Sequence, residues 1–165
     1  MTGVSLSVQT PGLKDVERAL GRVAGGLEER RALMDSIGAA IEGSTIRRFD
    51  QQKGPDGAPW KPSIRARQQG GKTLIDRGRL RQSITHQASA TQAQIGTNLI
   101  YAAIQQFGGT IRAKAGGALK FRLPGIGWRQ VASVTLPARP FLGISEDDRI
   151  EIADQVERYI AARVA

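Results

Sequence analysis

The segment Thr110–Leu123, TIRAKAGGALKFRL, has the clearest alternation of apolar and charged residues in the chain. Successive side chains of a β-strand point to opposite faces, so this alternation separates the apolar residues from the charged ones. The segment Ala115–Ala118, AGGA, lies between the two alternating arms and favours a hairpin bend. We therefore expect a β-hairpin with one cationic face, formed by Arg112, Lys114, Lys120 and Arg122.

Further strand patterns lie on both sides of this hairpin. Arg129–Leu136 alternates as a partner strand, and Ile84–Ala88 with Ala93–Thr97 predicts an antiparallel pair around a short polar turn. Tyr101–Phe107 predicts one or two helical turns that end at a pair of glycines. The middle of the chain is therefore expected to form an antiparallel sheet.

Helical spacing of apolar residues marks both ends of the chain. One stripe predicts a helix over Pro11–Leu27, and a second predicts a longer helix over Glu28–Asp50. Ser145 precedes three acids, which is typical of the N-cap and first turn of a closing helix. The predicted class is α+β, an antiparallel sheet with N-terminal helices and a C-terminal helix packed against it, plus an extended basic hairpin.

The composition indicates one domain over residues 1–165, long enough for a sizeable core. The chain is 40% hydrophobic, but no apolar run approaches the roughly 18 residues of a membrane span, so no membrane partner is expected. Met1–Thr10 has neither the basic start nor the apolar block of a signal peptide. The absence of cysteine excludes disulfides and thiolate sites and fits cytoplasmic synthesis.

Positive charge is concentrated in the middle of the chain. Between Gly57 and Ser145 there are 13 Lys and Arg residues and one acid, Asp76, which makes this segment +12. The rest of the chain is −3, because it holds 11 basic and 14 acidic residues. Such asymmetry indicates a surface that faces a polyanion or an acidic protein, although a solvated basic face without a ligand is the alternative.

The sequence offers little for catalysis. His86 is the only histidine, so a metal site would have to be assembled from scattered carboxylates, and a structural or solvent-facing role is favoured. The run Gly71-Lys72-Thr73 resembles the end of a phosphate loop, but Ala66 stands where the first glycine is required. We therefore expect neither an enzyme nor a cofactor.

Two proline-containing segments predict structural anchors. In Gly54-Pro55-Asp56-Gly57, Pro55 fixes φ and Gly57 can adopt the positive φ that a tight turn needs. Trp60 follows, and its indole is expected at the core edge with its N–H bonded, a contact with a partner being the alternative. Further on, Phe141 is expected to be buried, while Arg139 is either a donor to the backbone or an intersubunit ion-pair donor.

Four patches in fixed order resemble the phage virion morphogenesis family, the tail-completion proteins of tailed bacteriophages. These patches are Phe49–Trp60 (FDQQKGPDGAPW), Leu74–Ile84 (LIDRGRLRQSI), Tyr101–Gly109 (YAAIQQFGG) and Leu136–Gly143 (LPARPFLG). The third patch departs from the family pattern, because Gln105 stands where a histidine usually precedes Gln-Phe-Gly.

The resemblance implies a non-enzymatic virion protein at the tail top or neck, assembled in the host cytoplasm as a ring of identical subunits. Its implied partners are other copies, the tail tube or tail terminator, and the head connector, with DNA that passes through the ring as a further candidate. The charge distribution alone also fits a basic nucleic-acid-binding protein, and an uncharacterised nuclease is a third alternative. The structural anchors that we expect are Pro55, Gly57, Trp60, Tyr101, Phe107 and Phe141.

Contacts between subunits are expected to join the basic middle of one copy to an acidic helix end of the next. Leu80 and Ile84 lie four residues apart and should face inward, which directs Arg79 and Arg81 to the surface. The candidate interface residues are Arg79, Arg81, Arg112, Lys114, Lys120, Arg122, Arg139, Glu146, Asp147 and Asp148.

Overall fold

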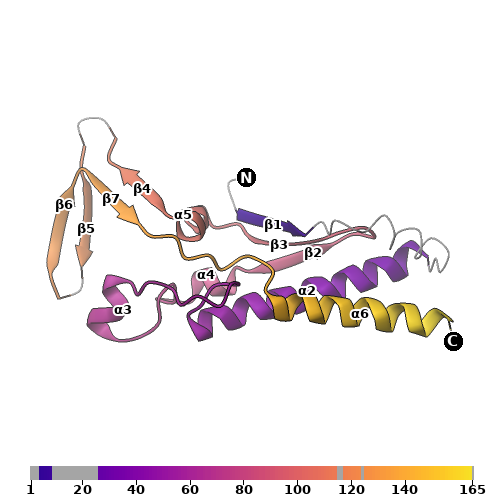
Figure 1. The fold of residues 1–165 in the computed structure, drawn as a ribbon. Coiled ribbons are helices and arrows are strands. Elements are labelled where there is room, and N and C mark those ends of the chain that lie inside the picture. Colours follow the sequence, from indigo (N-terminus) through magenta and orange to yellow (C-terminus); the bar gives the residue numbers. More distant parts are fainter. Residues whose placement is uncertain (1–3, 9–25, 115–116, 124, 165) are drawn as a thin grey trace.

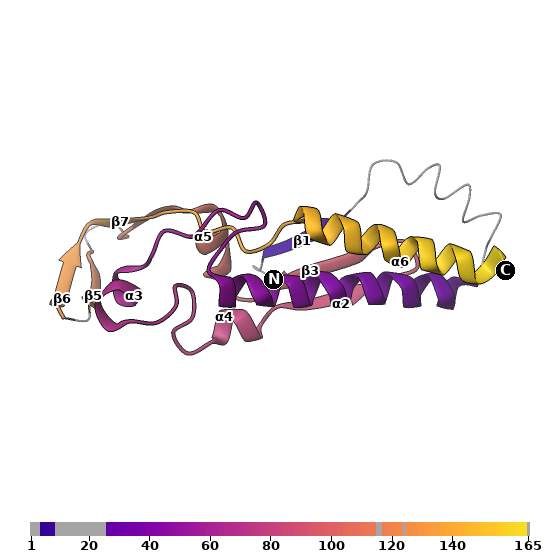
Figure 2. The same ribbon diagram turned by 60° about the horizontal axis from the view of Figure 1, so that its bottom comes forward.

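The computed structural model describes residues 4–8, 26–114, 117–123 and 125–164. Two long helices, α2 (Leu27–Gln51) and α6 (Glu146–Val164), lie side by side and run in opposite directions (Figures 1 and 2). Both helices were predicted, α2 within one residue at each end. The helix expected over Pro11–Leu27 falls almost entirely on residues 9–25, which lie outside the described part of the chain.

The helix α2 forms because its apolar residues recur every four positions and face the core. Its two acids in the first turn favour the helix dipole, and Gln52 ends it in the left-handed conformation with φ of 59°. The buried apolar residues of this face are Leu33, Ile37, Ile41 and Phe49.

A three-stranded antiparallel sheet packs against α2, in the order β1 (Val4–Val8), β3 (Ala93–Thr97), β2 (Thr85–Ala88). The predicted hairpin of β2 and β3 is confirmed, and it closes where Ser89 N–H donates to the Gln92 carbonyl at 2.9 Å. The strand β1 was missed, although the alternation of VSLSV was a sufficient signal.

His86 joins β2 to α2. Its Nδ1 lies 2.7 Å from Glu42 Oε2, and its Nε2 lies 3.3 Å from Asp35 Oδ1. Gly38 of α2 makes room for the ring, since a Cβ there would lie 2.5 Å from His86 Cδ2. The hydrogen bond to Glu42 raises the pKa of His86 above its usual value, against an opposing effect of burial. His86 is therefore structural.

The raised pKa predicts that stability falls as the pH rises. A group whose pKa is higher when folded stabilises the fold fully below its unfolded pKa, about 6.5 for histidine, and loses this contribution as the pH passes the folded pKa. Urea unfolding at pH values from about 5.5 to 9 should show this decline. The decline should be absent in His86→Gln, and an equal slope in both proteins would assign it to other groups.

The aromatic core joins segments that are far apart in the sequence. The ring of Phe49 lies 5.5 Å from the rings of both Trp60 and Phe141, measured between centroids. Trp60 Nε1 donates to the Pro140 carbonyl at 2.8 Å, which confirms the predicted buried indole with a bonded N–H. The turn before Trp60 also forms as predicted, with Gly57 at φ of 78°.

The strands β4 (Gly109–Arg112), β5 (Leu119–Leu123), β6 (Gly127–Val131) and β7 (Ser133–Leu136) form an arm that extends away from the paired helices (Figure 1). We call these four strands the arm. β4 pairs with β7, and β5 pairs with β6, both antiparallel. An additional bond from Ala113 N–H to the Ala132 carbonyl, 2.8 Å long, extends the β4–β7 ladder.

This pairing corrects the predicted hairpin of TIRAKAGGALKFRL. β4 and β5 do not pair with each other, because the chain reverses between β5 and β6 instead, where Gly125 and Gly127 have φ of 72° and 90°. The extended basic hairpin exists, but its two inner strands are β5 and β6. Arg112 and Lys114 therefore do not share a ladder with Lys120 and Arg122.

The described residues also contain three short helices, α3 (Ile64–Gln69), α4 (Arg79–Gln82) and α5 (Ala102–Phe107). Ser63 caps α3, since its hydroxyl accepts a hydrogen bond from Ala66 N–H at 3.1 Å. No helix in the described segments is both long and apolar enough to cross a membrane.

The helix α5 corrects two predicted anchors. Tyr101 is 43% exposed and Phe107 is 71% exposed, whereas Ala102 and Gln106 are buried. Residues four apart share a face of a helix, and in α5 the inward face is the one that carries Ala102 and Gln106. The Gln106 side chain accepts from the N–H groups of Phe141 and Leu142 and donates to the Leu142 carbonyl. These three backbone groups are therefore hydrogen bonded to a side chain and not to a neighbouring strand.

Candidate functional site

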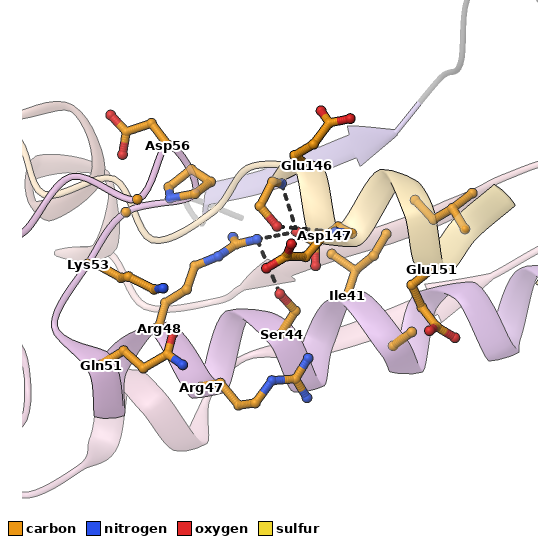
Figure 3. Close-up of a pocket in the computed structure, with 17 residues that line it drawn as sticks. Ile41, Ser44, Arg47, Arg48, Gln51, Lys53, Asp56, Glu146, Asp147 and Glu151 are labelled. Atoms are coloured by element: carbon orange, nitrogen blue, oxygen red, sulfur yellow. Dashed lines mark hydrogen bonds and ion pairs between the residues drawn. The ribbon is translucent and has the colours of Figure 1, made fainter. Parts of the chain in front are cut away.

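A buried ion pair fastens the start of α6 to α2. Arg48 and Asp148 are only 3% and 6% exposed, and their side chains are hydrogen bonded to each other. Arg48 Nη1 also donates to the carbonyls of Phe141 and Gly143, both at 2.9 Å. Its Nη2 donates to Ser44 Oγ at 3.3 Å (Figure 3). One guanidinium thus holds together α2, the segment before α6, and α6 itself.

The electrostatics of the pair favour its ionised form. Burial acts to raise the pKa of Asp148, but hydrogen bonds from Ser44 and Ser145 and the charge of Arg48 outweigh it, so the pKa is lowered overall. Burial is the main cause that lowers the pKa of Arg48, opposed by Asp148. Ser145 and Asp148 also cap each other, with N–H to side-chain distances of 2.8 and 3.2 Å, which confirms the predicted N-cap.

A cavity of about 650 Å³ lies over this pair, between α2, the turn at residues 53–57 and the first turns of α6 (Figure 3). Glu146 and Asp147 line it and are exposed, whereas Asp148 is withdrawn into the ion pair. Among the described residues, no cluster of three or more His, Asp and Glu could hold a metal. Asp148 therefore has a structural position, which corrects its expected role as an acid presented to a neighbouring subunit.

Arg139 also has an internal position. It is buried, and its Nε donates to the Lys61 carbonyl at 2.8 Å while Nη1 donates to Gln105 Oε1 at 3.4 Å. Burial lowers the pKa of Arg139. Of the two roles left open by the sequence, the structure shows the donor to the backbone, and the expected exposure of Arg139 at an interface is corrected. Gln105 is its side-chain partner.

A second cavity of about 1060 Å³ lies beneath the arm, and we call it the basic groove. Its walls come from α3, the segment before α4, the start of α5, and the arm strands β4, β5 and β7. The apolar residues that line it include Ile64, Leu74, Tyr101, Ile111, Phe121 and Leu136. The basic residues around them include Lys61, Arg65, Arg67, Arg77, Arg79 and Lys120, and one acid, Asp76, also lines the groove.

The structure separates the predicted interface arginines. Leu80 and Ile84 are buried as predicted, and Arg79 is exposed in the basic groove. Arg81 instead forms an ion pair within the chain, 2.9 Å from Asp50 Oδ2. Of the four arm cations, Lys120 lines the groove, whereas Arg112, Lys114 and Arg122 are exposed and are not among its lining residues.

The β5–β6 pair carries an exposed residue that sequence reasoning missed. Trp128 is 72% exposed and lies opposite Arg122 in the register, while Lys120 lies opposite Gln130. Cross-strand partners point to the same face, so these four side chains share one surface. The signal in the sequence was Trp128 itself, which directly precedes the predicted strand Arg129–Leu136.

The helix α6 presents an acidic surface on the side away from the core. Its partly buried residues include Ile152, Val156, Tyr159 and Ile160, and the first three pack against the core cluster. The exposed residues on the opposite side include Asp147, Ile150, Asp154 and Glu157, which we call the acidic stripe. Glu146 and Glu151 lie beside it and form ion pairs within α6, with Arg149 and Arg158 respectively. Ile150 is 57% exposed, and sequence reasoning missed it.

Comparison with known proteins identifies the family. Residues 12–161 match the phage virion morphogenesis family. The chain is 32% identical over 154 residues to the "Mu-like prophage FluMu G protein 2" of Haemophilus influenzae, which covers 93% of this chain and 95% of that protein. It is 31% identical over 147 residues to the "Putative capsid assembly protein G" of Escherichia phage Mu, with 84% of each chain covered. No solved structure matches significantly. The chain therefore belongs to the phage virion morphogenesis family, whose members have a structural part in building the phage particle.

Proposed function

We propose that the protein completes the phage tail or neck, where it forms a ring at the tail top and joins the tail to the head. The observation that carries this proposal is the arm, which extends away from the paired helices (Figure 1). The basic groove lies beneath it. The opposite charge lies elsewhere on the same chain, on the acidic stripe. A contact between two different surfaces of identical subunits is head-to-tail, and such contacts give a ring when the rotation between subunits closes and an open filament when it does not.

The ring would have two faces for different partners. We propose that the tail tube or tail terminator binds one face and the head connector binds the other, and that DNA passes through the opening. The protein would thus be part of the virion at the tail top or neck, after assembly in the host cytoplasm. Family membership supports the structural role, and the segregated charge supports assembly from like subunits.

The proposal predicts a defined assembly defect. Light scattering of the purified protein should give the mass of an oligomer with a fixed number of chains. The measurement should be made on the protein alone and again after it is mixed with tails. Electron microscopy of lysates in which the gene is inactivated should show filled heads and separate tails, and added protein should join them. Lysates without heads would instead favour a role in capsid assembly, which is the role given in the name of the phage Mu relative.

Nucleic-acid binding is a second candidate function, favoured by the exposed face of the β5–β6 pair. Trp128 could stack on bases while Lys120 and Arg122 contact phosphates. Tight binding that weakens steeply with salt would favour this function. A stable ring with weak and nonspecific DNA affinity would favour tail completion.

A further inference from the structure

We propose that the basic groove of one copy binds the acidic stripe of α6 of the next copy, with Ile150 inserted among the apolar residues of the groove. This inference rests on the proposed ring and names the two surfaces that would close it. It replaces Asp148, which is buried within its own chain, by residues that α6 presents to the outside.

The groove has the features of a site for an amphipathic segment. Ile64, Tyr101 and Ile111 line it and are 40%, 43% and 41% exposed. Contiguous apolar surface rimmed by charged residues marks interaction sites on soluble proteins. Exposed basic residues such as Arg77 and Arg79 line the same groove, so its occupant should combine apolar and acidic side chains.

The acidic stripe is a segment of this kind. Asp147, Ile150 and Asp154 are spaced by three and four residues, so they lie in one row along the exposed side of the helix. Ile150 is the apolar residue between two carboxylates in that row. In the proposed contact, Ile150 would pack against the apolar residues of the basic groove, and the carboxylates beside it would meet the basic residues around the groove. The exposed apolar surface of both elements would then be buried.

Position is also compatible. The arm lies at one end of the molecule and α6 extends toward the other end (Figures 1 and 2), so one copy can use both surfaces at once with different neighbours. That arrangement is the head-to-tail geometry of a ring.

Reciprocal charge reversal tests the pairing. The groove variant Arg77→Glu/Arg79→Glu and the stripe variant Asp147→Lys/Asp154→Lys should each associate about tenfold or more weakly than the natural protein at low salt, judged by light scattering. An equimolar mixture of the two variants should recover the oligomer, because each reversed surface then meets an opposite one. The four changes combined in one chain should recover it as well.

The arm supplies a matched control. Arg112→Glu/Arg122→Glu makes the same charge change on exposed arm residues that are not among those lining the groove, and it should leave the oligomer mass unchanged. All three variants change exposed residues, and their urea unfolding curves should match that of the natural protein. Equal weakening by the control would show a general effect of charge and would overturn the specific pairing.

Cross-linking gives a test that does not depend on charge, because the chain contains no cysteine. Ile64→Cys and Ile150→Cys, prepared as separate proteins and mixed, should give a cross-linked dimer with a short bismaleimide, and neither alone should do so. The double variant should give a ladder of cross-linked chains up to the ring. If the natural protein is monomeric even with tails present, the proposed ring is wrong. If the ring forms, but its mass does not respond to the charge reversals and the two cysteines do not cross-link, only this pairing is wrong.

Discussion

Arg48→Ala is expected to destabilise the fold by about 3 to 5 kcal/mol, the usual cost of removing one partner from a buried ion pair. The change leaves the carboxylate of Asp148 buried without its counter-charge, and it removes the donor to the carbonyls of Phe141 and Gly143. A domain of ordinary stability loses a large part of its unfolding free energy by such a change. Urea unfolding measured by circular dichroism at pH 7 gives the difference.

The neighbouring arginine provides the control for this prediction. Arg47 is exposed, so Arg47→Ala should change the free energy of unfolding by no more than about 0.5 kcal/mol. Arg48→Ala should also separate the start of α6 from α2, which would appear as faster hydrogen exchange in α6. Equal stability of the two variants would show that the ion pair does not fasten the helices.

Trp60→Ala is expected to cost about 3 to 5 kcal/mol, as is usual for removing a buried aromatic side chain. The indole packs edge-on against Phe49, and the loss of its N–H also leaves the Pro140 carbonyl without that donor. The melting temperature should fall accordingly. An unchanged melting temperature with loss of assembly would instead make Trp60 an interface residue.

The other tryptophan of the chain is a matched control. Trp128 is largely exposed at the arm, so Trp128→Ala should change stability by no more than about 0.5 kcal/mol. The two variants also separate the fluorescence of the two residues. The emission that remains in Trp128→Ala should come from a buried indole and shift to longer wavelength on unfolding, whereas the emission that remains in Trp60→Ala should shift little.

Local patterns were sufficient for the long helices and for one hairpin. The stripe of α2 and the N-cap at Ser145 are set by residues within a few positions of each other, and the β2–β3 hairpin is closed by its own short turn. In each case the hydrogen bonds join near neighbours, so periodicity and capping residues identify the element. The burial of Trp60 was also predictable, because its flanking prolines keep it out of a helix.

The sequence-based predictions were wrong for short segments in which several local patterns fitted the residues equally well. The segment AGGA suits a hairpin bend, yet the reversal occurs one strand later, and only the full ladder shows which strands pair. In α5 the aromatic residues Tyr101 and Phe107 suggested the inward face. The buried positions are instead those that allow Gln106 to satisfy the backbone at Phe141, a requirement that arises only when the two segments meet.

The sequence by itself determined the α+β class, the long helices, the buried tryptophan and the segregation of positive charge into the middle of the chain. Only the tertiary structure decided which charges are available to partners. Asp148 and Arg139 are buried and bonded inside the chain, and Arg81 is paired with Asp50. Arg79 and Ile150 remain exposed. The physical reason is that Arg48 and Asp148 lie 100 residues apart, and the burial of a charge depends on what the folded chain places against it.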